Sequence, residues 1–307
     1  MAGIFQAFFV ITALILAGAL FGRTKFGKAD NQILNWVIYF VLTPALLFSV
    51  IVKSDISVIV SPILVIGLGS ALVCMGMYIL LARVFFKDSG SKLVIGSMAA
   101  SWANAGNIGI PVAMYVLGSA QYVAPVILMQ IALLAPISAA VLDIITTNDG
   151  RNLRKALLQP LQNPILIAAL AGLAISVFHI PIPSYVIEPF TSLGNATVPL
   201  VLLLFGMALV HEKPLRSGKD IPQMLLASLL KLVVMPLISW LAGIFVFHLS
   251  GIMLLAVTIV GALPTAQSVF TYASRYSSGR TIARDSALAT TLLSIPVLLV
   301  ITLLISH

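Results

Sequence analysis

Charged residues and cysteine are scarce in this chain of 307 residues. Asp, Glu, Lys and Arg make up 8% of it, whereas about a quarter of a typical soluble domain is charged. The single cysteine, Cys74, excludes an internal disulfide and a zinc site made of several thiolates. The chain is instead 60% hydrophobic, with a mean hydropathy of +1.13. This composition predicts an integral membrane protein.

The common catalytic signatures are also missing: there is no Walker sequence, no His-Glu-x-x-His, no Gly-x-Ser-x-Gly and no cluster of Cys and His. An intramembrane enzyme would need a nucleophile with a base, or paired carboxylates, in the middle of apolar segments, and neither is visible. The formal net charge of +8 comes from basic residues spread over short loops, not from one basic face. We therefore expect no enzyme, no cofactor, no metal site and no nucleic-acid partner.

About 20 apolar residues cross a bilayer as a helix, and ten segments of the chain meet this requirement. Of the 17 Lys and Arg residues, fifteen follow odd-numbered segments, and among the alternate loops only Lys53 is basic. The positive-inside rule then predicts a multi-pass protein of the cell membrane with both termini outside the cytoplasm. The ten segments are 4–22, 32–52, 58–84, 92–117, 121–146, 160–179, 186–210, 221–247, 251–274 and 282–305.

The ten segments divide into two halves of five, residues 1–150 and 151–307. Because five is odd, the second half must enter the membrane from the opposite side, which makes an inverted repeat. Segments 2 and 7 each carry an internal proline, Pro44 and Pro199. The predicted fold is all-α, with ten transmembrane helices in two inverted five-helix repeats.

The fourth segment of each half is interrupted. The stretch 101–111 reads Ser-Trp-Ala-Asn-Ala-Gly-Asn-Ile-Gly-Ile-Pro, and 260–268 reads Val-Gly-Ala-Leu-Pro-Thr-Ala-Gln-Ser. Within a bilayer such a break persists only where protein or trapped water satisfies the freed backbone groups. Corresponding interruptions in two halves are the best sequence indication of a transporter's binding site.

We expect the two breaks to form a site for an organic anion near the midplane. Backbone N–H groups at half-helix ends, together with neutral side chains, can hold a carboxylate without a full buried positive charge. The alternative is that these polar side chains only tie helices together. The candidate residues are Asn104, Gly106, Asn107, Pro111, Pro264, Thr265, Gln267 and Ser268.

Three further polar residues fall within apolar segments. Lys231 lies about 15 Å along the eighth segment at 1.5 Å per residue, and can attract the anion, replace a coupling cation, carry a proton, or simply bind backbone carbonyls. Gln130 is a candidate ligand of a cation site, and Asp143 is either a solvated helix end or a proton or cation ligand. Coupling to H⁺ or Na⁺ is therefore left open, although no acidic residue lies at the midplane.

These motifs resemble the auxin efflux carrier family, whose members include plant auxin carriers and bacterial carriers for dicarboxylates such as malate and malonate. The resemblance rests on Asn-x-x-Asn-x-Gly-x-Pro at 104–111, Gly-Asn-Ala-Thr-Val-Pro at 194–199, Phe-Gly-Met-Ala-Leu at 205–209 and Leu-Thr-Pro-Ala at 42–45. It implies broken helices 4 and 9 that cross at their prolines, in a fold similar to the bile acid sodium symporters. It also implies a homodimer.

The resemblance further implies two domains in each subunit. A scaffold of helices 1, 2, 6 and 7 would cover 4–52 and 160–210 and form the dimer contact. A transport domain of helices 3–5 and 8–10 would cover 58–146 and 221–305. The implied function is secondary transport of small organic anions by an elevator movement. The alternatives are an uncoupled anion channel or facilitator and a sodium-coupled symporter of the bile-acid type.

Overall fold

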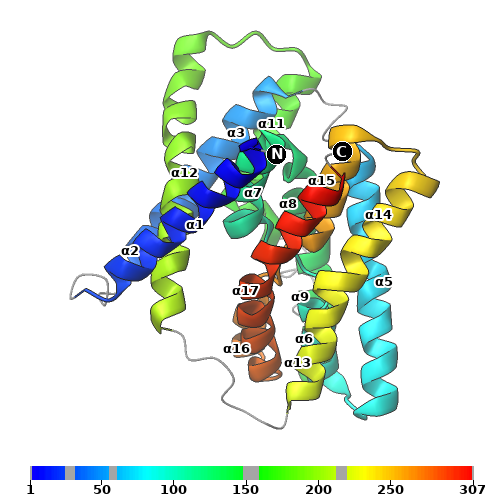
Figure 1. Cartoon of the computed structure of the whole chain (residues 1–307). Coiled ribbons are helices and arrows are strands. Elements are labelled where there is room, and N and C mark those ends of the chain that lie inside the picture. Colours follow the sequence, from blue (N-terminus) through cyan, green and yellow to red (C-terminus); the bar gives the residue numbers. More distant parts are fainter. Residues whose placement is uncertain (1, 25–31, 55–60, 148–158, 212–219, 306–307) are drawn as a thin grey trace. The chain divides into compact units, whose positions relative to one another are not determined.

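The computed structural model describes residues 2–24, 32–54, 61–147, 159–211 and 220–305 (Figure 1). In these ranges the regular elements are helices, together with one isolated antiparallel bridge between Ala103 and Thr265. The predicted all-α class is therefore confirmed. Eight of the basic loop residues used to orient the chain lie outside the described residues: Lys25, Lys28, Arg151, Arg154, Lys155, Lys213, Arg216 and Lys219.

Six helical stretches within these ranges are long and apolar enough to cross a membrane: Gln32–Lys53, Pro62–Phe85, Ala120–Thr146, Ser184–Ala208, Ile221–Phe245 and Arg280–Ile305. Four shorter apolar helices are Phe8–Gly22, Ala105–Leu117, Pro164–Val177 and Gly251–Ala262. Each of the ten predicted segments overlaps one of these ten stretches. Ten membrane crossings and an inverted repeat nevertheless stay predictions.

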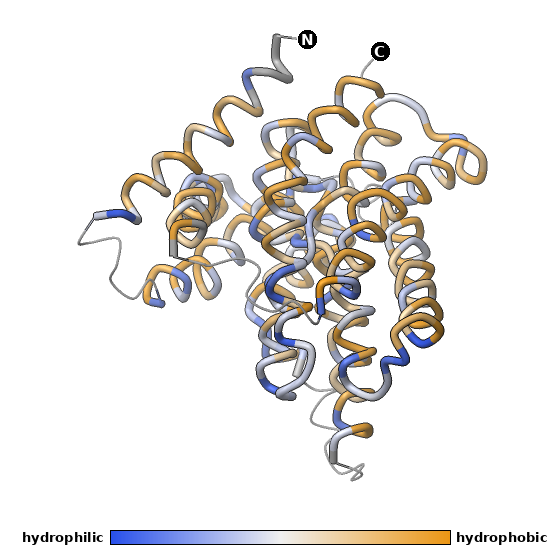
Figure 2. The backbone as a smooth tube through the Cα atoms, turned by 60° about the horizontal axis from the view of Figure 1, so that its bottom comes forward, coloured by the Kyte–Doolittle hydropathy of each residue, from blue (hydrophilic) through white to orange (hydrophobic). Residues whose placement is uncertain are grey.

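The outer faces of these helices carry large apolar side chains. Phe9, Phe85 and Leu304 are each at least 70% exposed, and the hydropathy of the backbone tube is high along most of its helices (Figure 2). A soluble protein does not present apolar surface on this scale. These faces suit contact with lipid.

The chain forms two compact units. Unit 1 comprises residues 1–61, 106–128 and 161–213, and unit 2 comprises 62–105, 129–160 and 214–307. Unit 1 contains nearly all of the two ranges predicted as scaffold and also takes in 106–128. Which unit moves and which is fixed stays a prediction.

Unit 1 is built on contacts of two long helices. Helix α1 (Ala2–Gly22) packs along α12 (Ser184–His211), and α3 (Thr43–Lys53) packs against α11 (Pro164–Val177) and α12. Asn163 caps α11, since its side-chain oxygen accepts from the backbone N–H of Ile165 at 2.9 Å. The other elements of unit 1 are α2 (Gln32–Val37), η1 (Ile38–Leu42), α7 (Ile110–Val112), η3 (Ala113–Leu117) and η4 (Ala120–Tyr122).

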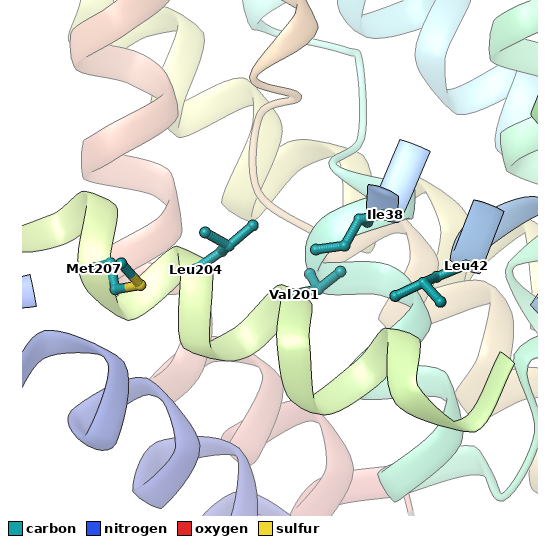
Figure 3. Close-up of a cluster of buried hydrophobic side chains, with 5 residues drawn as sticks. All are labelled: Ile38, Leu42, Val201, Leu204 and Met207. Carbon is teal, nitrogen blue, oxygen red and sulfur yellow. The ribbon is translucent and has the colours of Figure 1, made fainter. Parts of the chain in front are cut away.

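Two kinds of contact hold α12 in unit 1. On one side its apolar residues pack with η1 in a buried cluster, which Figure 3 shows: Ile38, Leu42, Val201, Leu204 and Met207. On the side of α1 the helices approach closely at glycines. A Cβ at Gly206 would overlap the carbonyl oxygen of Ile15, and one at Gly18 would overlap that of Leu203. Small residues at such contacts let transmembrane helices pack backbone to backbone.

Unit 2 contains the second interruption and residues 101–105 of the first. Its helices are α5 (Pro62–Phe85), α6 (Gly90–Ala99), α9 (Ala135–Thr147), α13 (Ile221–Leu229), α14 (Met235–Phe245), α15 (Gly251–Ala262), α16 (Ser268–Arg275) and α17 (Arg280–Ile305). Helix α15 packs between α14 and α17, and α6 packs on α5 and α9. Three elements have residues in both units: η2 (Ala105–Gly109), α8 (Ala124–Met129) and η7 (Gln159–Gln162), which precedes α11.

Prolines widen the helices of unit 2 at two places. The π-helical turn η5 (Gln130–Leu134) comes directly before Ala135-Pro136, and η9 (Leu230–Val234) comes before Met235-Pro236. A proline has no N–H and its ring clashes with the carbonyl four residues earlier, so the preceding turn opens. Such π-turns recur at functional positions. Here each one begins at, or one residue before, a polar residue in an apolar helix.

Candidate functional site

Both interrupted segments have extended backbone where they meet in unit 2. Helix α6 ends at Ala99 and α15 at Ala262, and the segments that follow pair antiparallel around Ala103 and Thr265. The N–H of Asn104 donates to the carbonyl of Pro264 at 2.7 Å, and the N–H of Ala266 donates to that of Trp102 at 2.9 Å. The meeting of the two interruptions therefore rests on main-chain hydrogen bonds. We call residues 101–105 and 263–267 the crossing.

Gln130 closes the open edge of the crossing. Its side-chain oxygen accepts from the N–H of Ala103 at 2.8 Å, and its side-chain nitrogen donates to the carbonyl of the same residue at 2.9 Å. The amide thus satisfies the N–H of Ala103 and is a second donor to its carbonyl, which also accepts from the N–H of Ala105 at 2.7 Å. This arrangement favours a structural role over the predicted role of Gln130 as a cation ligand.

Thr265 joins the crossing to the end of α6. Its hydroxyl donates to the carbonyl of Ala99 at 2.7 Å, and its N–H donates to the hydroxyl of Thr290 at 2.9 Å. Both threonines are fully buried. Because the last carbonyls of a helix lack intrahelical partners, the Thr265 side chain caps α6. Its observed contacts are those of a connector within the protein, and its predicted role in binding the anion stays a prediction.

Lys231 caps the C-terminal end of α15, as Thr265 caps that of α6. Its ammonium donates to the carbonyl of Gly261 at 2.7 Å and lies 3.2 Å from the sulfur of Met235. The side chain is completely buried. The sequence left four roles open for Lys231. The contact seen in the structure is the fourth of them, a hydrogen bond to a backbone carbonyl.

The other predicted residues outside the pairing lie in two different places. Gly106, Asn107 and Pro111 fall in the ranges of unit 1, with Pro111 in α7. The first segment thus pairs through Trp102 and Asn104, and the expectation that it crosses at Pro111 is corrected. The reason is that extended backbone is needed for pairing, whereas Pro111 lies inside the helical stretch Ala105–Leu117, just after the π-helical turn η2. Gln267 and Ser268, in unit 2, have exposed side chains at the start of α16.

The sequence analysis expected N–H groups at helix ends near the crossing, but two of the helix ends there are C-termini. Both α6 and α15 reach the crossing with their C-termini, and α16 leaves it with its N-terminus. A C-terminus carries partial negative charge, which repels an anion. Thr265 and Lys231 bind at those two C-termini. An anion would therefore bind more favourably to the N–H groups at the N-terminus of α16 than at either C-terminus.

Asp143 lies away from the crossing, near the end of α9. It accepts a hydrogen bond from the hydroxyl of Tyr276 at 2.6 Å and is buried. Burial, followed by this hydrogen bond, raises the pKa of Tyr276, so its phenol remains the donor at neutral pH. The pair joins α9 to the residue after α16, which favours a structural role over the predicted proton or cation role.

Trp102 is the residue of the crossing that the sequence analysis missed. Its side chain is 3% exposed, and its ring meets that of Tyr272 edge to face at 5.5 Å. Among the described residues its indole nitrogen has no hydrogen-bond partner. A buried donor normally has one. The position of Trp102 inside the interruption, two residues before Asn104, was the available signal.

A sequence model of the family described as "membrane transport protein" matches residues 3–302, which is nearly the whole chain. The chain belongs to that family. The resemblance to auxin efflux carriers is thereby confirmed, and with its apolar helices the protein is a multi-pass membrane transporter. It is also 24% identical, over 299 residues and 94% of each chain, to the uncharacterized transporter MJ1031 of Methanocaldococcus jannaschii.

Proposed function

We propose that this transporter is a secondary carrier of small organic anions, of the auxin or malate and malonate type, across the cell membrane. The observation that carries the proposal is the crossing, where two interrupted segments leave backbone and side-chain donors inside a membrane protein. The buried indole N–H of Trp102 and the side chain of Asn104 are the donors nearest to the bridge in sequence. Donors of this kind suit a carboxylate that must be bound and then released.

The proposed cycle moves unit 2, which holds the crossing, relative to unit 1, so that the anion faces each side of the membrane in turn. In this proposal unit 1 is the scaffold and forms the homodimer, and both termini lie outside the cytoplasm. The tightly packed glycines of α1 and α12 support a rigid scaffold. The extended backbone of the crossing suits a site, because irregular backbone at membrane depth persists where it lines a cavity.

The deciding experiment measures uptake of labelled mono- and dicarboxylates into proteoliposomes, with and without Na⁺ and a pH gradient. A carrier shows saturable uptake and counterflow, in which internal unlabelled substrate accelerates entry of the label. A channel shows neither. If no member of the panel enters faster than into empty liposomes, the organic-anion proposal is wrong.

The asparagines of the first interruption supply the next prediction. Asn104→Ala and Asn107→Ala should each slow uptake about tenfold, since a hydrogen bond to a charged group contributes about 1.5–3 kcal/mol. Both variants should elute as the wild-type species in size-exclusion chromatography. Normal uptake by both would remove these side chains from the site.

The contribution of the Trp102 indole N–H to anion binding can be tested while an aromatic side chain is kept at this position. Trp102→Phe keeps an aromatic ring against Tyr272 but removes the donor. It should raise the KM for the anion about tenfold with little effect on the maximal rate, since uniform binding is lost. Trp36→Phe is the matched control, because Trp36 is 56% exposed. An unchanged KM in Trp102→Phe would assign this tryptophan to packing alone.

A further inference from the structure

Lys231 is a cation enclosed entirely by the protein. None of its surface is exposed, and among the described residues no carboxylate lies within salt-bridge distance of its ammonium. The nearby thiol of Cys74, also fully buried, is directed at the carbonyl of Leu230 at 3.7 Å. An uncompensated buried charge is very costly. Something other than an acidic side chain must therefore stabilise this one.

The compensating group is the C-terminal end of α15. Gly261, whose carbonyl accepts from Lys231, is the last residue but one of this helix. The helix stops there because Leu263 adopts extended backbone (φ −58°, ψ 144°) and Pro264 follows. The last carbonyls of a helix carry about half a negative charge, and a hydrogen bond from an ammonium to such a carbonyl is favourable.

The surrounding helices are shaped for this contact. Lys231 lies in the π-helical turn η9, which comes directly before Met235-Pro236. Gly261 lets α14 come close, since a Cβ there would lie 2.7 Å from the hydroxyl of Ser239 and 3.0 Å from the Cα of Pro236. A larger residue at 261 would push the two helices apart. The lysine thus reaches a helix end that lies three residues before Pro264 of the crossing.

We propose that the Lys231 ammonium is a built-in cation that neutralises the broken end of α15, so that the carrier needs no bound sodium ion at the crossing. This inference rests on the proposed function and adds that transport of the anion is not coupled to sodium. A half-helix C-terminus inside a membrane protein is a natural position for a metal cation. In this chain the position is taken by a side chain that cannot dissociate. Lys231 is accordingly a positioning residue, which keeps the crossing in the geometry that receives the anion.

The unmodified protein provides the first test. Uptake of the carboxylate identified in the panel should stay within about twofold when Na⁺ is replaced by K⁺ or choline at constant ionic strength. The melting temperature of the purified protein should likewise be the same in these salts. Uptake that requires Na⁺, or a melting temperature that Na⁺ raises over choline, would overturn the proposal.

The second test removes the ammonium and returns it. Lys231→Met, of similar length and no charge, should slow uptake about tenfold or more. Lys231→Ala should melt at a lower temperature than the wild type, and ethylammonium, or Na⁺ itself, should raise its melting temperature and part of its uptake. Lys53→Ala is the control, because Lys53 is an exposed lysine bonded to Thr191. Wild-type uptake and melting in Lys231→Met would overturn the proposal.

Failure of this inference is distinguishable from failure of the proposed function. If no carboxylate is transported, the anion proposal falls, but the melting temperatures still report whether an external cation replaces Lys231. If a carboxylate is transported and ethylammonium does not stabilise Lys231→Ala more than Lys53→Ala, only the role of Lys231 falls. Should Lys231→Ala fail to fold, the sodium comparison on the wild-type protein decides.

Discussion

Replacing Gln130 with leucine should reduce uptake about 100-fold, because the N–H of Ala103 would lose its partner and the carbonyl of Ala103 would keep only the N–H of Ala105. A buried backbone group without a hydrogen bond costs about 1–3 kcal/mol, and each 1.4 kcal/mol corresponds to about a factor of ten. The expected result is a protein that still inserts and elutes normally but whose crossing no longer holds its geometry. Initial uptake rates in proteoliposomes, at matched protein content, measure this effect.

Two variants sharpen the interpretation of this result. Gln162→Leu makes the same change at an exposed glutamine and should leave uptake unchanged. In Gln130→Glu, only the protonated side chain can both accept from and donate to Ala103, whereas the ionised form faces the carbonyl with a negative charge. Uptake by Gln130→Glu, relative to the wild type, should therefore rise as the pH is lowered. Wild-type uptake in Gln130→Leu would show that the clamp on Ala103 is dispensable.

The second large effect concerns stability in unit 1. Gly206→Ala places a methyl group on the main-chain carbonyl of Ile15 and within 2.8 Å of the N–H of Ala19. Backbone atoms cannot rotate away as a side chain does, so α1 and α12 must separate along their contact. We expect a loss of about 3 kcal/mol, at the upper end for overpacking. Thermal unfolding, followed as loss of the monodisperse peak in size-exclusion chromatography, measures it.

The chain offers a matched control for this substitution. Gly76 lies in α5, and a Cβ added there meets no atom within 4 Å. Gly76→Ala should leave stability unchanged or raise it slightly, because alanine has the higher helix propensity. Equal melting temperatures for Gly206→Ala and Gly76→Ala would mean that the contact between α1 and α12 tolerates an extra methyl group.

Much of the fold could be predicted from the sequence because a bilayer allows few solutions. Apolar length located the helices, and the prolines and glycines located the interruption before Gly106 and the one around Pro264. The point of pairing could not be found in this way. Pro111 lies within the helix that resumes at Ala105, whereas the extended backbone that pairs lies before that helix, around Ala103, and no residue type there predicts the pairing.

The roles of the polar side chains were harder to predict than their positions. Gln130, Lys231 and Thr265 were each identified as functional candidates, yet each binds a backbone group of another segment. Sequence gives the donors and acceptors of a residue but not the distant carbonyl it reaches. The prolines at 136 and 236 held a usable signal, because the π-turns that precede them include Gln130 and Lys231.

The antiparallel bridge has a consequence for how readily this protein can acquire a new cargo. Trp102, Asn104, Pro264 and Ala266 hold it through their main-chain atoms, which are the same whichever side chains are attached. Neighbouring positions are thus free to exchange one side chain for another without dismantling the junction. Descendants of a single ancestor can in this way diverge in what they carry while the machinery that carries it stays intact.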